Sequence, residues 1–173
     1  MCSSDLQHDA YMVRWIAAIA ALTVLFGGVV DSQAQQAALT PKAPIHSCDH
    51  LAANPIDPGR AADGVATALL RVEAAIRACQ EAVRLYPQEL RFQFQLGRSL
   101  RQANRTEEAF KWYQGAAERG YAGAQNSIGV MYARGEAVKE DCVAAARWFQ
   151  LAAAQGYPAA ADNMRTLSCV RQV

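Results

Sequence analysis

The chain contains 173 residues, of which 17 are Lys or Arg and 16 are Asp or Glu, so its formal net charge is +1. Hydrophobic residues make up 52% of it, which favours a folded protein of one domain over a disordered chain. Because no basic stripe is present that would neutralise several phosphates, nothing predicts nucleic-acid binding. Alanine is abundant and alternating β-branched residues are scarce after residue 60, which predicts an all-α fold.

Residues 1–34 are predicted to be a secretory signal peptide. Arg14 precedes an apolar stretch over 15–30, and the small residues of 32–34 place the expected cleavage after Ala34. An uncleaved membrane anchor is the alternative, but this stretch is shorter than the roughly 20 apolar residues that span a bilayer. We therefore expect a periplasmic or secreted bacterial protein that has no membrane attachment after cleavage.

The first eleven residues do not fit a signal peptide, because an acidic residue lies where such a segment needs none. Their opening hexapeptide, MCSSDL, resembles a translated sequencing-library adapter. We expect Met12 to be the natural start.

Four cysteines follow the signal peptide, an even number in a chain expected to meet an oxidising compartment. Three pairings are possible. Helical geometry favours Cys142 with Cys169, because one helix should begin near Cys142 and the next should return antiparallel and end near Cys169. The remaining pair, Cys48 with Cys79, would attach the N-terminal segment to a helix. Four buried free thiols are the alternative.

Residues 35–70 are predicted to be an irregular lead-in, rich in Pro, Gly and Asp and without a sustained period. Residues 71–173 are predicted to be a helical repeat domain. Apolar spacing, proline and glycine positions define its helices, which we place at 72–86, 89–102, 107–118, 122–133, 143–154 and 158–167. Thr106 is expected to cap the third of these, and Gly120 and Gly156 to end two of them in the left-handed conformation.

Two similar segments lie thirty-six residues apart (148 − 112 = 36): WYQGAAERGYAGAQ begins at Trp112 and WFQLAAAQGYPAAA begins at Trp148. A fixed period indicates a repeated structural unit. Each unit is predicted to be a helical hairpin that buries its apolar stripe against its neighbours, which makes an α-solenoid. Glycine within a helix costs about 1 kcal/mol relative to alanine. Gly97 and Gly129 therefore predict close approach by a ring, that of Tyr113 or Phe149.

Several of these residues match the tetratricopeptide register: Leu96-Gly97, Leu100, Ala109, Tyr113 and Ala116. The next unit has four additional residues and the pattern A-x-x-W-F-x-x-A-A-x-Q-G, which resembles the Sel-like repeat (SLR) subfamily. The resemblance covers residues 87–160. It implies an α-solenoid that acts as a protein-interaction scaffold or adaptor and not as an enzyme.

In the tetratricopeptide register, the first helix of each hairpin lines a concave groove. The resemblance therefore implies a partner-binding groove lined by Arg91, Phe94, Arg98, Arg101, Asn126, Val130 and Arg134. Arginines at helical spacing would suit an acidic segment or a terminal carboxylate of a protein or peptide partner. A solvated charged face without a ligand is the alternative. Trp112 and Trp148 are expected to be core residues.

The sequence leaves two other functions as alternatives. The sequence HSCDH offers His46, Cys48, Asp49 and His50 as metal donors, but their spacing fits no structural zinc signature, and a loop with a disulfide cysteine is favoured. A metal-binding periplasmic protein is therefore an alternative only. So is a small cell-envelope enzyme or enzyme subunit acting on peptidoglycan-type substrates, because no phosphate-binding loop or nucleophile elbow is present. We predict no catalytic residue, no metal and no cofactor.

Overall fold

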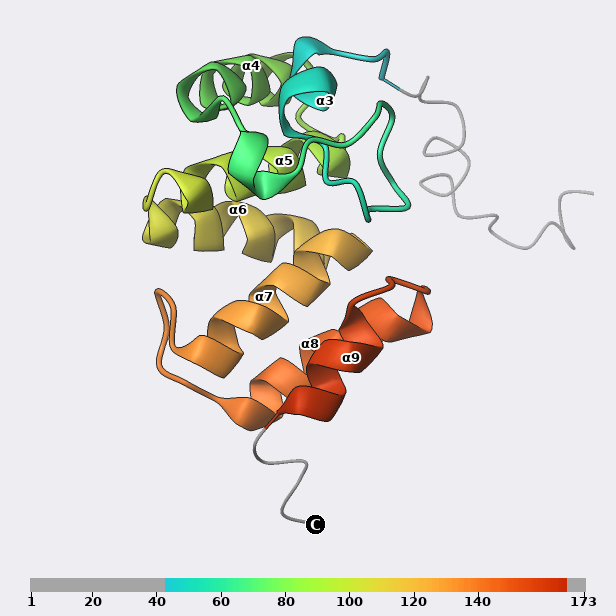
Figure 1. Ribbon diagram of the computed structural model, residues 1–173, viewed down its shortest axis with the longest axis vertical. Helices are drawn as coiled ribbons and strands as arrows, with labels where there is room; N and C mark the ends of the chain where they lie inside the picture. Colours follow the sequence, from blue (N-terminus) through green and yellow to red (C-terminus); the bar gives the residue numbers. More distant parts are fainter. Residues whose placement is uncertain (1–42, 168–173) are drawn as a thin grey trace, which may run out of the picture. The chain divides into compact units, whose positions relative to one another are not determined.

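Seven α-helices and one 3-10 helix follow one another in residues 43–167, the part of the chain that the computed structural model describes (Figure 1). They are α3 (Ser47–Ala52), η1 (Thr67–Leu69), α4 (Val72–Leu85), α5 (Leu90–Gln102), α6 (Thr106–Glu118), α7 (Ala122–Arg134), α8 (Cys142–Ala154) and α9 (Ala160–Thr166). No strand occurs among these residues, so the all-α prediction is confirmed. The predicted signal peptide lies outside the described residues.

The helices from α4 onwards pack each on the next along the chain, as stacked hairpins do. Figure 1 shows these helices one below another, from α4 and α5 to α8 and α9. Each begins and ends within two residues of its predicted bounds. The predicted α-solenoid is therefore the fold of this part of the chain.

Large rings of one helix lie against glycines of another in both repeats. A Cβ atom added to Gly97 would lie 2.8 Å from the Tyr113 ring, and one added to Gly129 would lie 2.6 Å from the Phe149 ring. Both rings are buried. The predicted reason for the two mid-helix glycines is thus confirmed: they let bulky side chains approach the backbone.

The turns that end α6 and α8 are the same. Gly120 and Gly156 have φ values of +93° and +76°, in the left-handed region, as predicted. In each turn the N–H of the following tyrosine donates to a carbonyl five residues earlier, Tyr121 to Ala116 and Tyr157 to Ala152. The repeated Gly-Tyr pair therefore has one structural role in both units.

The predicted cap at Thr106 is wrong. Thr106 is the first residue of α6, its N-cap is Arg105, and no side-chain cap bond is present. Asn104, which has a left-handed φ of +59°, lies in the turn between α5 and α6. At the equivalent place in the next unit, Asp141 does cap α8 by accepting from the Ala144 N–H at 2.8 Å.

The lead-in is more ordered than predicted. His46 and Asp49 form a capping box at the start of α3, a helix too short to show a period in the sequence. Residues 53–65 then form a loop whose ends meet, because the Val65 N–H donates to the Ala53 carbonyl at 2.8 Å. Compact loops of this kind are Ω-loops, and we call residues 53–65 the Ω-loop.

A disulfide joins Cys48 of α3 to Cys79 of α4, as predicted. The two residues are separated by 31 positions, and closing a loop of this length stabilises the fold by roughly 3–4 kcal/mol in the chain-entropy model. Cys142 is also disulfide-bonded. Cys169, its predicted partner, lies outside the described residues, so that pairing stays a prediction.

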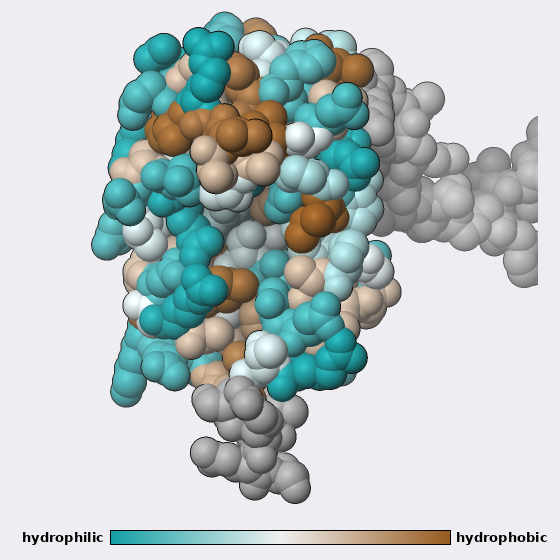
Figure 2. Space-filling view, in the orientation of Figure 1, coloured by the Kyte–Doolittle hydropathy of each residue, from teal (hydrophilic) through white to brown (hydrophobic). Residues whose placement is uncertain are grey.

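The surface that Figure 2 shows is largely hydrophilic, and its hydrophobic groups form separate small patches. Between residues 43 and 167, no helix has the combination of length and hydrophobicity that crossing a membrane requires.

Alanine substitutions of three glycines test the close packing. A Cβ at Gly115 would have its nearest neighbour at 3.9 Å, so Gly115→Ala is expected to stabilise the protein by about 0.5–1 kcal/mol through helix propensity. Overpacking should make Gly97→Ala and Gly129→Ala less stable than Gly115→Ala by about 1–3 kcal/mol. Urea unfolding of the three variants measures this difference, and equal stabilities would contradict the proposed role of the glycines.

Candidate functional site

Helix α5 is buried along ten consecutive residues, 91–100, because α3, α4 and α6 all pack on it. Five of these residues are polar: Arg91, Gln93, Gln95, Arg98 and Ser99. A buried polar group is costly unless it is hydrogen-bonded. The partners of these side chains therefore determine which of them are available to a ligand on this face of the solenoid.

Arg91 binds the start of the lead-in. Its Nε lies 3.1 Å from Asp49 Oδ1 and its Nη1 lies 2.8 Å from Glu89 Oε2, so two carboxylates compensate one guanidinium. Its Nη2 also donates to the carbonyls of Ala43 and Pro44. Arg91 is only 1% exposed. The prediction that it lines an open groove is wrong, because the lead-in covers it.

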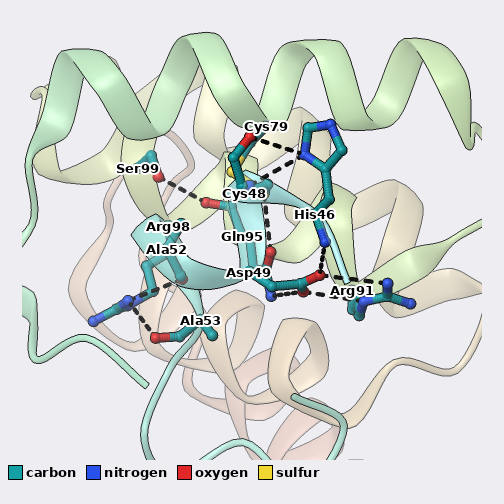
Figure 3. The surroundings of a disulfide bond; sticks show 11 residues. His46, Cys48, Asp49, Ala52, Ala53, Cys79, Arg91, Gln95, Arg98 and Ser99 are labelled. Carbon is teal, nitrogen blue, oxygen red and sulfur yellow. Dashed lines mark hydrogen bonds and ion pairs between the residues drawn. A yellow bond between two sulfur atoms is a disulfide. The ribbon is translucent and has the colours of Figure 1, made fainter. Parts of the chain in front are cut away.

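Arg98 binds the other end of α3 (Figure 3). Its Nη1 donates to the carbonyls of Ala52 and Ala53 at 3.0 and 3.1 Å. Its Nη2 donates to the Val65 carbonyl and to Thr67 Oγ1. Arg98 thereby satisfies carbonyls at the end of α3 and holds both ends of the Ω-loop. The lead-in covers most of Arg98, which is 7% exposed and does not lie on an open groove.

Phe94 is a core residue. It is 1% exposed, and its ring centroid lies 5.8 Å from that of Tyr113 and 5.3 Å from that of Tyr121. A Cβ at Gly123 would lie 3.0 Å from its ring. Almost all of its surface is therefore used in packing.

The Ω-loop crosses both repeats and is held by the tyrosine of each. The Tyr121 hydroxyl donates to Asp57 Oδ2 at 2.6 Å, and Asn54 Nδ2 donates to the Tyr157 hydroxyl oxygen at 3.3 Å. Tyr121 and Tyr157 occupy the same repeat position (157 − 121 = 36). Burial raises the pKa of Asp57, although hydrogen bonds from Tyr121 and the Gly59 N–H oppose the shift. Burial first, and then the Asp57 charge, raise the pKa of Tyr121.

A pocket of about 180 Å³ lies between the Ω-loop, α5 and α7, and we call it the Ω-loop pocket. Five of the predicted groove residues line it: Phe94, Arg98, Arg101, Asn126 and Val130. The other lining residues are Asn54, Ile56, Thr67, Gln102, Tyr113, Ser127 and Tyr157. The structure therefore brings together most of the predicted set. The residues of the lead-in were missed because that segment has no period to interpret.

Arg101 and Arg134 both contact Glu136. Arg101 donates to it through Nε and Nη2 at 2.8 and 2.9 Å, while Arg134 Nη1 lies 3.5 Å from Glu136 Oε1. Arg134 lies outside the Ω-loop pocket, and with Val130 it lines a second pocket of about 240 Å³ next to Cys142.

Three of the four possible metal donors of HSCDH have other partners, and the fourth, His50, is exposed. Cys48 is in the disulfide, Asp49 pairs with Arg91, and His46 Nδ1 accepts from the Cys48 N–H. Within residues 43–167, no three His, Cys, Asp or Glu side chains are placed to hold a metal ion. HSCDH is thus the capped start of α3 and not the loop that the sequence predicted.

Trp112 and Trp148 are partly buried, and both pack against the main hydrophobic core. Their packing agrees with the predicted core role, although each keeps some exposed surface.

Stacked hairpins with interlocking small and large residues define a helical-repeat protein, a fold of the protein-interaction scaffold kind. Two segments, 93–121 and 122–157, match the family model described as Sel1 repeat. The chain belongs to the Sel1 repeat family. Each matched segment ends at a tyrosine that holds the Ω-loop, Tyr121 or Tyr157.

Comparison with solved structures finds a Sel1 repeat protein from Oxalobacter formigenes, known from its crystal structure. It is 33% identical, the match covers 54% of this chain and 71% of that chain, and the TM-score is 0.47. Comparison with curated proteins gives no match.

Substitution of Asp49 tests how strongly the lead-in is held. Asp49→Asn removes one of the two carboxylates that compensate Arg91. It should destabilise the protein by roughly 3 kcal/mol, the low end for a broken buried ion pair, because Glu89 remains. Glu81→Gln, which breaks the exposed pair with Arg84, is the matched control and should change stability little. Chemical denaturation compares the two, and similar effects would contradict the structural role of Asp49.

The pH dependence of stability tests the burial of Asp57. Because its pKa is raised above the ordinary value of 3.8, the folded chain takes up this proton before the unfolded chain does. Lowering the pH from 7 towards 3.8 should therefore stabilise the wild type relative to Asp57→Asn. Unfolding free energies across that range measure the effect, with the exposed Asp63→Asn as the control. If the unfolding free energy of the wild type minus that of Asp57→Asn stays constant or falls on acidification, the raised pKa of Asp57 is contradicted.

Proposed function

We propose that this protein is an exported scaffold that binds another polypeptide at the Ω-loop pocket and on the surface around it. The single observation that supports this is the pocket itself, in which five of the side chains that the repeat register directs inward come together. Helical-repeat proteins use this face for partners. The site differs from a long open groove because the Ω-loop covers part of α5.

The pocket dimensions limit how a partner would bind. Its volume of about 180 Å³ lies below the roughly 300–1,000 Å³ of pockets that enclose drug-sized ligands, so it is large enough only for a small part of a partner. One residue of a partner would enter the pocket, and the remainder would lie against its rim. Exposed Gln102 and the 46% exposed side chain of Ile56 are available there for polar and apolar contacts.

Export is supported by cysteine usage. Cys48 and Cys142 are disulfide-bonded, and such bonds persist chiefly in oxidising compartments. This agrees with the signal peptide that the sequence predicts. We do not propose an enzyme, because the pocket lining contains no carboxylate, histidine or cysteine that would serve as acid, base or nucleophile.

Site-specific photocrosslinking in the native cell envelope tests the proposal. A photoreactive phenylalanine replaces Gln102 at the pocket rim or, as the control, exposed Lys111 on α6, which does not line the pocket. We expect a discrete polypeptide to be crosslinked from position 102 and not from position 111. Identical products from both positions, or none from position 102, would overturn the proposal.

A further inference from the structure

Arg98 is a buried cation without a counter-ion, in contrast to Arg91. The two lie seven residues apart on one face of α5 (98 − 91 = 7), about two helical turns. Arg91 has two carboxylate partners, whereas every acceptor of Arg98 is a neutral carbonyl or hydroxyl. None of the ion pairs among residues 43–167 includes Arg98.

An uncompensated buried charge is expensive, and the fold does not remove it. Arg98 is 7% exposed, and burial lowers the pKa of its guanidinium. An arginine nevertheless remains protonated at neutral pH. The side chain that clamps the Ω-loop therefore brings one net positive charge to the pocket it lines.

Residues that line the same pocket also carry unused hydrogen-bond donors. Four such groups have no acceptor among the described residues: Nε–H of Arg98, Nη1–H of Arg101, the Tyr157 hydroxyl proton and Nδ2–H of Asn126. The Tyr157 oxygen accepts from Asn54, and Asn126 Oδ1 accepts from Asn163. The lining is thus rich in donors and contains no Asp or Glu.

The charge balance favours a monoanion. Arg101 has an ion-pair partner in Glu136, which it shares with Arg134 outside this pocket, so Arg98 is the one charged side chain of the lining without an ion-pair partner. A carboxylate carries one negative charge and two acceptor oxygens, which suits this set of donors. Phe94, Val130 and Ile56 line the pocket as well and would contact the apolar part of the residue that carries it.

We propose that the Ω-loop pocket binds a single carboxylate group of the partner polypeptide, with Arg98 as its counter-ion. This inference rests on the proposed function. It makes the lead-in a wall of the binding site, because Asn54 and Ile56 of the Ω-loop and Thr67 of η1 line the pocket. Ligand binding and the packing of the Ω-loop then stabilise each other.

Titration of the ¹⁵N-labelled, oxidised protein with short peptides tests the proposal by NMR. The probes are acetyl-Gly-Gly-Gly-Val with a free carboxyl terminus, the same peptide amidated, and amidated acetyl-Gly-Gly-Glu-Gly. We expect the Arg98 Nε–H and Asn126 side-chain signals to shift with a carboxylate-bearing peptide and not with the neutral one. A response to the first peptide identifies a chain terminus, and a response to the third identifies an acidic side chain.

Equal shifts with the neutral peptide, or with inorganic phosphate at matched ionic strength, would overturn the proposal. So would the absence of shifts with both carboxylate peptides.

A charged variant of matched shape provides the second measurement. Asn126→Asp keeps the oxygen that accepts from Asn163 but adds a negative charge to the pocket. It should weaken binding of the responsive peptide by about tenfold or more, as expected for like charges placed together. Gln80→Glu makes the same charge change on the exposed face of α4 and should leave binding unchanged. An unchanged affinity in Asn126→Asp would overturn the proposal. Arg98 itself is left intact, because it holds the Ω-loop.

The two proposals fail separately. Crosslinking from position 102 without any carboxylate response would leave the scaffold function standing and remove the carboxylate site. Shifts that require a carboxylate peptide, without a crosslinked polypeptide, would leave the carboxylate site standing and remove the scaffold function.

Discussion

The contacts of Arg98 join the two parts of the described chain. One guanidinium binds the last carbonyls of α3 and the far end of the Ω-loop, so the lead-in folds against the repeats over α5. The disulfide at Cys48 fixes the near end of the same segment to α4. Without a side chain that satisfies these carbonyls, the loop would leave polar backbone groups buried and unpaired. The pocket depends on this arrangement, because one wall of it is the lead-in.

The repeat period predicted most of the fold. Apolar spacing and the positions of proline and glycine placed the helices, and the cost of glycine within a helix predicted the rings that lie against Gly97 and Gly129. The repeat period did not predict α3 or the Ω-loop, because their stability comes from distant partners and not from local spacing. Asp49 forms an ion pair with Arg91. Asp57 accepts a hydrogen bond from Tyr121, which lies more than sixty residues further along the chain (121 − 57 = 64). Such pairs leave no periodic pattern in a sequence.

The candidate site was predicted only in part for a related reason. A helical register gives the direction in which a side chain points, and it placed Arg98, Arg101 and Asn126 around one pocket. It does not give what lies over that side chain. The lead-in covers Arg91, and Phe94 packs against Tyr113 and Tyr121, so residues expected to contact a partner contact the chain itself. Tyr157 has a role that its place in a turn did not reveal.

The spacing of Tyr121 and Tyr157 constrains how this solenoid can change in length. Both tyrosines bind one loop, Tyr121 at Asp57 and Tyr157 at Asn54. The loop therefore spans the distance from one unit to the next. A whole unit inserted between them would carry Tyr157 out of reach of Asn54. A unit added beyond Tyr157 would disturb neither anchor. The loop therefore links the tyrosine turns of two successive units through one segment that is not itself a repeat.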